Sequence, residues 1–266
     1  MSLGKWIGGI VGFMTLGPLG ALAGIVIGSM FDEKDKYVQD GQGQGQGPYS
    51  TQDAYNSHDM GQRDSFLFAM LVMASYIIRA DGRVMHSEME YVRQMLRRNF
   101  GEIAVRQGEQ ILLKLFEEQK RMDQSSPYAF KRTVIDCGRQ IASNLSYAER
   151  LQLLSFLVEI AKCDGTVCTA EVEALREVTQ AMGLNSHEID SLLNLQGNSL
   201  EDAYKVLEVD PNATDDEVRS AYRRMAVKHH PDKVASLGED IRQAANEKFQ
   251  RINEAKERIY KARGMK

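Results

Sequence analysis

Residues 222–233 read YRRMAVKHHPDK, a stretch that predicts a helix ending abruptly in a rigid turn. Tyr222 and Met225 lie three positions apart on one helical face, and basic side chains occupy the other face. Pro231 disfavours helical backbone geometry at the residue before it, so we expect the His-Pro-Asp turn at the head of a loop. The stretch therefore predicts a small surface that displays a loop beside a row of cations.

Two further helices are predicted around this one. Ser199 and Asp202 suit the first turn of a short helix, which an Asp-Pro-Asn sequence ends. Thr214 and Glu217 form a capping box for the helix that carries the basic face. A third helix, from about residue 240 to residue 261, has apolar residues at helical spacing. The end of the chain is therefore predicted to form a helical module with two long antiparallel helices.

Four segments of this module, which spans residues 199–266, resemble the J-domain, the signature of DnaJ-type co-chaperones. They read AYKVL at 203–207, AYRRMA at 221–226, HPDK at 230–233 and KFQRINEA at 248–255. A lone HPD tripeptide would be a weak signal, but four segments in this order and spacing are specific. The resemblance implies the helical-hairpin fold of a J-domain.

The resemblance also implies a function and the residues that perform it. J-domains bind DnaK-type ATPase chaperones in their ATP state and stimulate hydrolysis, and the matching loop residues are His230, Pro231 and Asp232. A row of cations favours fast, salt-sensitive docking on an acidic groove. The positions that match the docking face of the family are Arg219, Tyr222, Arg223, Arg224 and Lys228. The alternatives are an ordinary solvated helix face for the cations and a simple helix end for the loop.

Helical periodicity also runs through residues 65–196, which contain an internal repeat. ADGRVMHSE at 80–88 recurs as CDGTVCTAE at 163–171. Both copies resemble the second half of an EF-hand loop. In the first copy, however, Ile77 and Arg79 would occupy loop positions one and three, where calcium requires oxygen ligands. We therefore interpret the repeat as a pseudo-symmetric helical bundle and not as a calcium-binding pair.

This bundle resembles the TerB-type helical domain of tellurite-resistance proteins, which carries such Asp-Gly turns between helices. In that family the acidic loop residues have been proposed to bind metal, and the matching candidates are Asp81, Glu88, Asp164 and Glu171. The structural alternative is that the aspartates cap helix ends and the glycines supply backbone with positive φ. Ser87 and Glu90 are predicted to form a capping box after the first turn.

Residues 6–31 contain no charged side chain, and the span exceeds the roughly 20 residues that cross a bilayer as a helix. We predict a transmembrane helix here, with a signal peptide or a buried core helix as the alternatives. Gly20, Gly24 and Gly28 form a small-residue stripe through which two copies could associate as a homodimer. Glycines are also common in membrane helices without that role. The charges that flank the span leave its orientation open.

The remaining features narrow the class of protein. Residues 32–64 are polar and rich in glycine and glutamine, which predicts a flexible tether. The net charge of −4 argues against nucleic acid as the main partner. Cys137, Cys163 and Cys168 form neither an even framework nor a CxxC pair, so we expect reduced cytosolic thiols. We find no pattern that indicates catalysis, and predict a non-enzymatic protein without a cofactor.

The predicted chain is all-α, with an N-terminal transmembrane helix, a central TerB-like bundle and a C-terminal J-domain. This order resembles the membrane-anchored DjlA-like co-chaperones. The resemblance implies a single pass through the bacterial inner membrane, with the C-terminal domains in the cytoplasm, and leaves the client proteins unspecified. Two other classes stay open. One is a metal- or tellurite-responsive membrane stress protein that acts through the TerB-like domain, and the other is an enzyme whose site assembles only in space.

Overall fold

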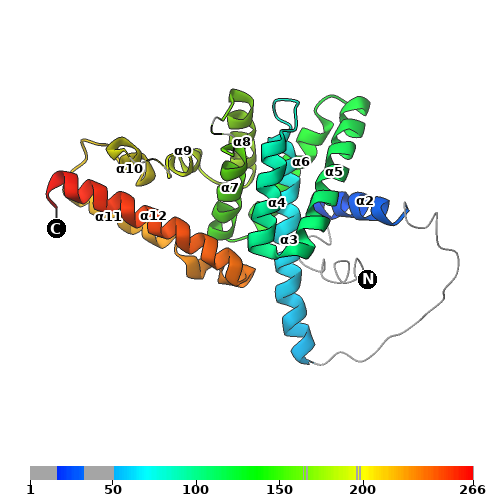
Figure 1. The fold of residues 1–266 in the computed structure, drawn as a ribbon, viewed down its shortest axis with the longest axis horizontal. Helices are drawn as coiled ribbons and strands as arrows, with labels where there is room; N and C mark the ends of the chain where they lie inside the picture. The colour runs from blue at the N-terminus through cyan, green and yellow to red at the C-terminus, as the bar shows by residue number, and fades with distance from the viewer. Residues whose placement is uncertain are drawn as a thin grey trace.

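The computed structural model describes residues 17–32, 51–163, 165, 167–195, 197 and 199–265, with side chains for all of these except residues 27–32 and 51–62. The described residues are helical and contain no strand, which confirms the all-α fold (Figure 1). The helices are α2 Pro18–Asp32, α3 Thr51–Ile78, α4 His86–Phe100, α5 Glu102–Ser125, α6 Ala129–Asn144, α7 Tyr147–Ala161, α8 Thr169–Ala181, α9 His187–Asn194, α10 Leu200–Val206, α11 Asp215–Lys228, the short 3-10 helix η1 Pro231–Leu237, and α12 Glu239–Arg263.

The bundle is built around α3. From residue 65 to residue 75 every side chain of this helix is buried, because α5, α6, α7 and α8 all pack against it. Phe66 lies edge-on to Phe156 of α7, with ring centroids 6.4 Å apart. A helix that is apolar on all sides belongs at the centre of a core. The apolar residues of the first predicted helix, Phe66, Met70, Met73 and Ile77, are all fully buried.

The structure starts α3 earlier than the sequence analysis expects. Residues 51–64, assigned there to the flexible tether, form the first turns of this helix. Once nucleated, a helix propagates through polar sequence that lacks strong breakers, and residues 51–64 contain no proline and a single glycine, Gly61. Residues 33–50 lie outside the described residues.

The two Asp-Gly turns join α3 to α4 and α7 to α8. Gly82 and Gly165 adopt φ values of +82° and +91°, so both glycines supply left-handed backbone. Glu88 accepts a hydrogen bond from the Met85 N–H at 2.8 Å, and Glu171 accepts one from the Cys168 N–H at 2.7 Å. These two carboxylates therefore cap the starts of α4 and α8.

The capping box predicted at Ser87 and Glu90 is wrong, because α4 begins two residues earlier than it requires. The box lies at Met85 and Glu88 instead. Glu90 faces outward and pairs with Arg93, with 3.2 Å between the carboxylate oxygen and the guanidinium nitrogen. None of the three cysteines forms a disulfide within the described part of the chain.

The second half of the predicted transmembrane span forms α2, which packs against α5 and α6. Leu19, Leu22 and Val26 are buried on that side. Gln140 of α6 accepts a hydrogen bond from the Leu19 N–H at 2.9 Å. Among the described residues, none of the helices combines the length and apolar character that spanning a membrane requires. Residues 6–16 of the predicted span lie outside the described residues.

The small-residue stripe is described only in part. Gly24 lies on the exposed side of α2, and Gly20 is half-buried. A side chain added at Gly24 would meet no atom within 4 Å. Gly28 lies in the part of α2 where side chains are not described. Homodimerisation through this stripe stays a prediction.

The C-terminal module packs against one side of the bundle. Its long helices α11 and α12 run antiparallel, and α10 packs across α12 (Figure 1). The end of α12 near Glu239 lies beside α4, whereas η1 lies against α3 and α7. The loop that carries the His-Pro-Asp turn is therefore held at the seam between module and bundle.

Candidate functional site

The His-Pro-Asp turn is a rigid loop with an exposed carboxylate. His230 is extended, with φ −64° and ψ +128°, as a residue before proline should be. Its Nδ1 accepts the Asp232 N–H at 3.3 Å, and its ring lies edge-on to Phe249 of α12, 5.7 Å between centroids. The side chain of Asp232 is 73% exposed, and its Oδ2 lies 3.6 Å from His230 Nδ1. The loop thus fixes its backbone while presenting a carboxylate to solvent.

The loop is held from below by apolar packing. Val234 and Leu237 of η1 are buried, although Lys233, Ala235 and Ser236 beside them are exposed. The 3-10 helix begins at Pro231, whose fixed φ suits a first helical position and whose missing N–H is not needed there. These two buried side chains hold η1 in place directly after the turn, so the backbone of the turn is fixed while its side chains stay exposed.

The basic face of α11 is displayed in part, at its three arginines. Thr214 and Glu217 form the predicted capping box: the Glu217 carboxylate accepts the Thr214 N–H at 2.7 Å, and this bond lowers the pKa of Glu217. Arg223 and Arg224 are exposed. Arg219 is half-buried and pairs with Asp216 at 2.9 Å, one turn earlier on the same helix. Such exposed local pairs contribute little to stability, so these cations stay available to a partner.

Tyr222 sits at the edge of this face and ties two helices together. Its hydroxyl donates to Asn253 Oδ1 of α12 at 2.9 Å. The ammonium of Lys256 lies 5.0 Å from the centre of its ring, a cation–π geometry. Tyr222 therefore positions α11 on α12 and leaves only part of its ring on the docking face.

Lys228, the last predicted member of the docking face, is mostly covered. Its side chain is 17% exposed and pairs with Glu188 of α9, which is itself 2% exposed. It also pairs with Glu208, in the loop after α10, at 2.9 Å. The side chain that the sequence placed on an open surface is held between two carboxylates, one of which belongs to the bundle.

Two buried bases lie beneath the loop. Burial, reinforced by the charges of Lys248 and Lys228, holds the pKa of His229 well below its usual range. Burial also lowers the pKa of Lys248 to about 7, against the opposing pull of Glu159 and Glu188. The Nε2 atom of His229 has no hydrogen-bond partner within the described part of the chain. Adjacent histidines thus have opposite environments, since His229 is buried and His230 is exposed.

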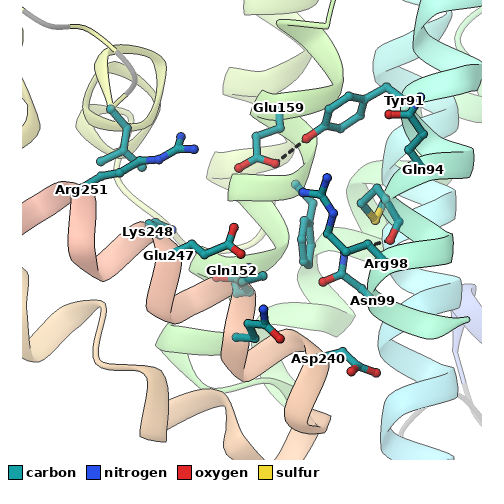
Figure 2. Close-up of a pocket in the computed structure, with 15 residues that line it drawn as sticks. Tyr91, Gln94, Arg98, Asn99, Gln152, Glu159, Asp240, Glu247, Lys248 and Arg251 are labelled. Carbon is teal, nitrogen blue, oxygen red and sulfur yellow. Dashed lines mark hydrogen bonds between the residues drawn. The ribbon is translucent and has the colours of Figure 1, made fainter.

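A cavity of about 90 Å³ lies at the seam between α12 and the bundle helices α4 and α7 (Figure 2). Figure 2 shows carboxylates and cations around it: Glu159 accepts a hydrogen bond from the Tyr91 hydroxyl at 2.5 Å, and Arg98, Glu247 and Arg251 line the rest. Because both signs of charge surround the cavity, it favours no ligand of one charge.

The four metal candidates are not brought together by the residues that the structure describes. Asp81 is exposed, and its Oδ1 accepts the Arg83 N–H at 2.8 Å. Glu88 and Glu171 serve as caps in different turns, and Asp164 lies outside the described residues. Within the described chain no three His, Cys, Asp or Glu side chains are placed to share a metal ion.

Sequence reasoning missed the residues that support the loop. The signal for Phe249 was present, because Lys248-Phe249 begins the last segment that resembles a J-domain. Glu188 carries no local signal, since it lies 40 positions before Lys228 and meets it only through the packing of α9.

Comparison with known families agrees with this geometry. Residues 202–263 match the family model of the DnaJ domain, residues 67–194 match that of the tellurite resistance protein TerB, and residues 1–47 match that of the co-chaperone DjlA transmembrane domain. No solved structure matches the chain.

Curated relatives match nearly the whole length of this chain. The chain is 27% identical to the co-chaperone protein DjlA of Photobacterium profundum, with 99% of each chain covered. It is 25% identical to DjlA of Coxiella burnetii, over 99% of this chain and 98% of the relative. It is 27% identical to DjlA of Legionella pneumophila, over 98% and 95% respectively.

The fold, the loop and the family match together define a J-domain protein whose J-domain is packed on a TerB-type bundle. The relatives that it matches over its whole length are named as co-chaperones. With the transmembrane-domain match in the same order, the chain has the domain order and the full-length similarity of the DjlA-like co-chaperones.

Proposed function

We propose that this protein recruits a DnaK-type chaperone and stimulates its ATPase through the J-domain. The observation that carries the proposal is the pairing of a rigid loop with an exposed carboxylate, Asp232, beside the displayed guanidiniums of α11. The protein itself offers the partner a surface, and the hydrolysis takes place in the partner's own site.

Each part of the surface has a distinct task. The guanidiniums of Arg219, Arg223 and Arg224 steer an acidic groove toward α11 and set the speed of encounter. The His-Pro-Asp loop then makes the short-range contact that couples docking to hydrolysis, which requires a backbone that does not yield. Pro231 and the ring of Phe249 against His230 provide that stiffness.

The direct test is His230→Gln in the full-length protein. Gln cannot reproduce the edge-on ring contact with Phe249, so we expect stimulation of the partner's ATPase to be lost while the helical content and melting temperature stay unchanged. His86→Gln is the matched control, because His86 is an exposed histidine on the bundle and its replacement should leave stimulation intact. Wild-type stimulation by His230→Gln would refute the proposal.

We also propose that the N-terminal segment anchors the protein in the bacterial inner membrane with the J-domain on the cytoplasmic side. The match of residues 1–47 to a co-chaperone transmembrane domain supports anchoring, and the need of the partner for ATP supports the cytoplasmic side. In fractionated cells the protein should stay with membranes after a high-salt and carbonate wash. Protease added to intact spheroplasts should leave the J-domain uncut. Release by the wash or cleavage from outside would contradict the anchor or the orientation.

A further inference from the structure

Lys228 cannot contact a chaperone and pair with the bundle at the same time. On α11 it matches the docking face of the J-domain, where Arg223 and Arg224 are exposed to solvent. In the structure its ammonium is covered and pairs with Glu188 of the bundle. A chaperone that takes this cation must first separate it from that carboxylate.

The bundle holds Glu188 in position from its own side. The hydroxyl of Tyr147 on α7 donates to the same oxygen, Oε1, that pairs with Lys228, with an O···O distance of 2.5 Å. Burial and the Glu188 carboxylate raise the pKa of Tyr147, so this hydroxyl stays a donor at physiological pH. Glu188 therefore reaches the J-domain as a fixed acceptor and not as a mobile side chain.

Two features favour separation of the Lys228–Glu188 ion pair. The second carboxylate oxygen of Glu188, Oε2, is buried without a hydrogen-bond partner in the described part of the chain, a cost that exposure to water would remove. Lys228 keeps Glu208, a carboxylate of its own module, after separation. Two other bonds across the seam are exposed: Ser236 donates to Glu149 at 3.0 Å, and Arg63 pairs with Asp240 at 3.0 Å. A buried bond, from Ser191 Oγ of α9 to the Val206 carbonyl of α10 at 3.0 Å, keeps α9 attached to the module.

We propose that Glu188 is a latch by which the TerB-type bundle withholds Lys228 from the chaperone, so that full docking requires α11 to part from α9, while α10 stays packed on α9. The proposal rests on the proposed function, because it assumes that Lys228 belongs to the docking face. Latched and open states would be in equilibrium, and the chaperone would bind the open state better. A ligand of the bundle that shifted α9 would then regulate the J-domain.

The test uses the full-length protein in detergent micelles and measures how ATPase stimulation of a DnaK-type chaperone depends on its concentration. Glu188→Gln keeps the size of the side chain and an acceptor for Tyr147, but removes the charge that holds Lys228. We expect the half-maximal concentration to fall by about five-fold or more, in the usual range of coupling between two sites.

Glu208→Gln is the matched control, because it removes the other carboxylate of Lys228 and leaves the latch in place. It should change the half-maximal concentration by less than about two-fold. An equal gain in both variants would overturn the latch, since it would show that the charge on Lys228 matters and not its attachment to the bundle. If Glu188→Gln does not fold, Tyr147→Phe, which removes only the hydroxyl, should give a smaller gain in the same direction.

Amide hydrogen exchange of residues 187–194 and 215–228 separates failure of the latch from failure of the proposed function. Faster exchange at both segments in Glu188→Gln, but not in Glu208→Gln, supports the latch even if the wild-type protein does not stimulate the chaperone. Unchanged exchange together with unchanged stimulation overturns the latch and leaves the proposed function standing.

Discussion

The His-Pro-Asp turn and the first Asp-Gly turn are both exposed, acidic connections between helices, yet they use their carboxylates in opposite ways. Asp81 bonds to the Arg83 N–H inside its own turn, and a side chain added at Gly82 would meet no atom within 4 Å. Asp232 is left to solvent, while its backbone is fixed by Pro231 and by buried residues of η1.

The difference shows how a turn is made available to a partner. A carboxylate that completes its own turn is already satisfied, and binding it elsewhere would cost the turn its closing hydrogen bond. A carboxylate on a backbone fixed by other means can be contacted without loss of structure. Residue type alone does not distinguish the two cases, since both sequences place an aspartate beside a residue with restricted or unusual φ.

The strongest test of this difference is to remove the aspartate charge from each turn in a separate variant. Asp232→Asn should reduce stimulation of the chaperone ATPase by at least about thirty-fold, as expected when one partner of a desolvated charge pair is lost. Asp81→Asn should leave stimulation unchanged. A comparable loss in both variants, measured in the same steady-state assay, would show that the Asp-Gly turn also takes part in coupling.

The His-Pro-Asp turn also differs from the Asp-Gly turn in that a buried histidine, His229, precedes it and makes stability depend on pH. The folded protein keeps His229 neutral, whereas the unfolded chain protonates it below about pH 6.5. Because the unfolded state then binds more protons, this residue costs stability as the pH falls, by about 1 kcal/mol per pH unit. Lys248, Lys228 and His230 line the same small cavity, and its lining in the described part of the chain contains no carboxylate. Glu188 and Glu208 reach this region through their pairs with Lys228.

The measurement is the free energy of unfolding in urea between pH 5 and pH 6.5. His229→Gln should have a flatter slope than the wild type, and His187→Gln, an exposed histidine, should not. Asp64, whose pKa burial raises to about 6, titrates in the same range with the opposite sign, so the comparison between variants is the test. Equal slopes in all three proteins would contradict a neutral, buried His229.

The smallest effect is expected at the Asp-Gly turn. Gly82→Ala introduces no clash but forces an L-residue to φ +82°, which should cost about 1 kcal/mol of stability. Stimulation of the chaperone should not change. Thermal unfolding of the full chain measures the first effect, and a melting temperature equal to that of the wild type would show that the turn relaxes.

Local sequence was enough to predict the displayed surface. The box of Thr214 with Glu217, the proline after His230 and the spacing of the arginines each act within a few residues, and the structure contains all three. The resemblance to a J-domain added the role of these residues. Nothing local indicated that Lys228 would meet Glu188, because their contact depends on how α9 packs between bundle and module.

The predicted starts of α3 and α4 were wrong for a related reason. The predicted box at Ser87 fits the capping pattern, but the backbone turned at Gly82 and started α4 two residues earlier. The early start of α3 similarly depends on a core that nucleates the helix near Phe66 and extends it backward into polar sequence. In both cases tertiary structure selected among local patterns of similar quality.

The positions of α2 and the J-domain have a mechanical consequence. Figure 1 shows them on opposite sides of the bundle: α2 lies on α5 and α6, and the module lies on α3, α4 and α7. The packed helices between them fix the distance from α2 to the module. This distance does not depend on the conformation of the residues that precede α3. While the module stays docked, a displacement of α2 moves the loop with it as one solid piece. Only parting of the seam would give the loop freedom to swing.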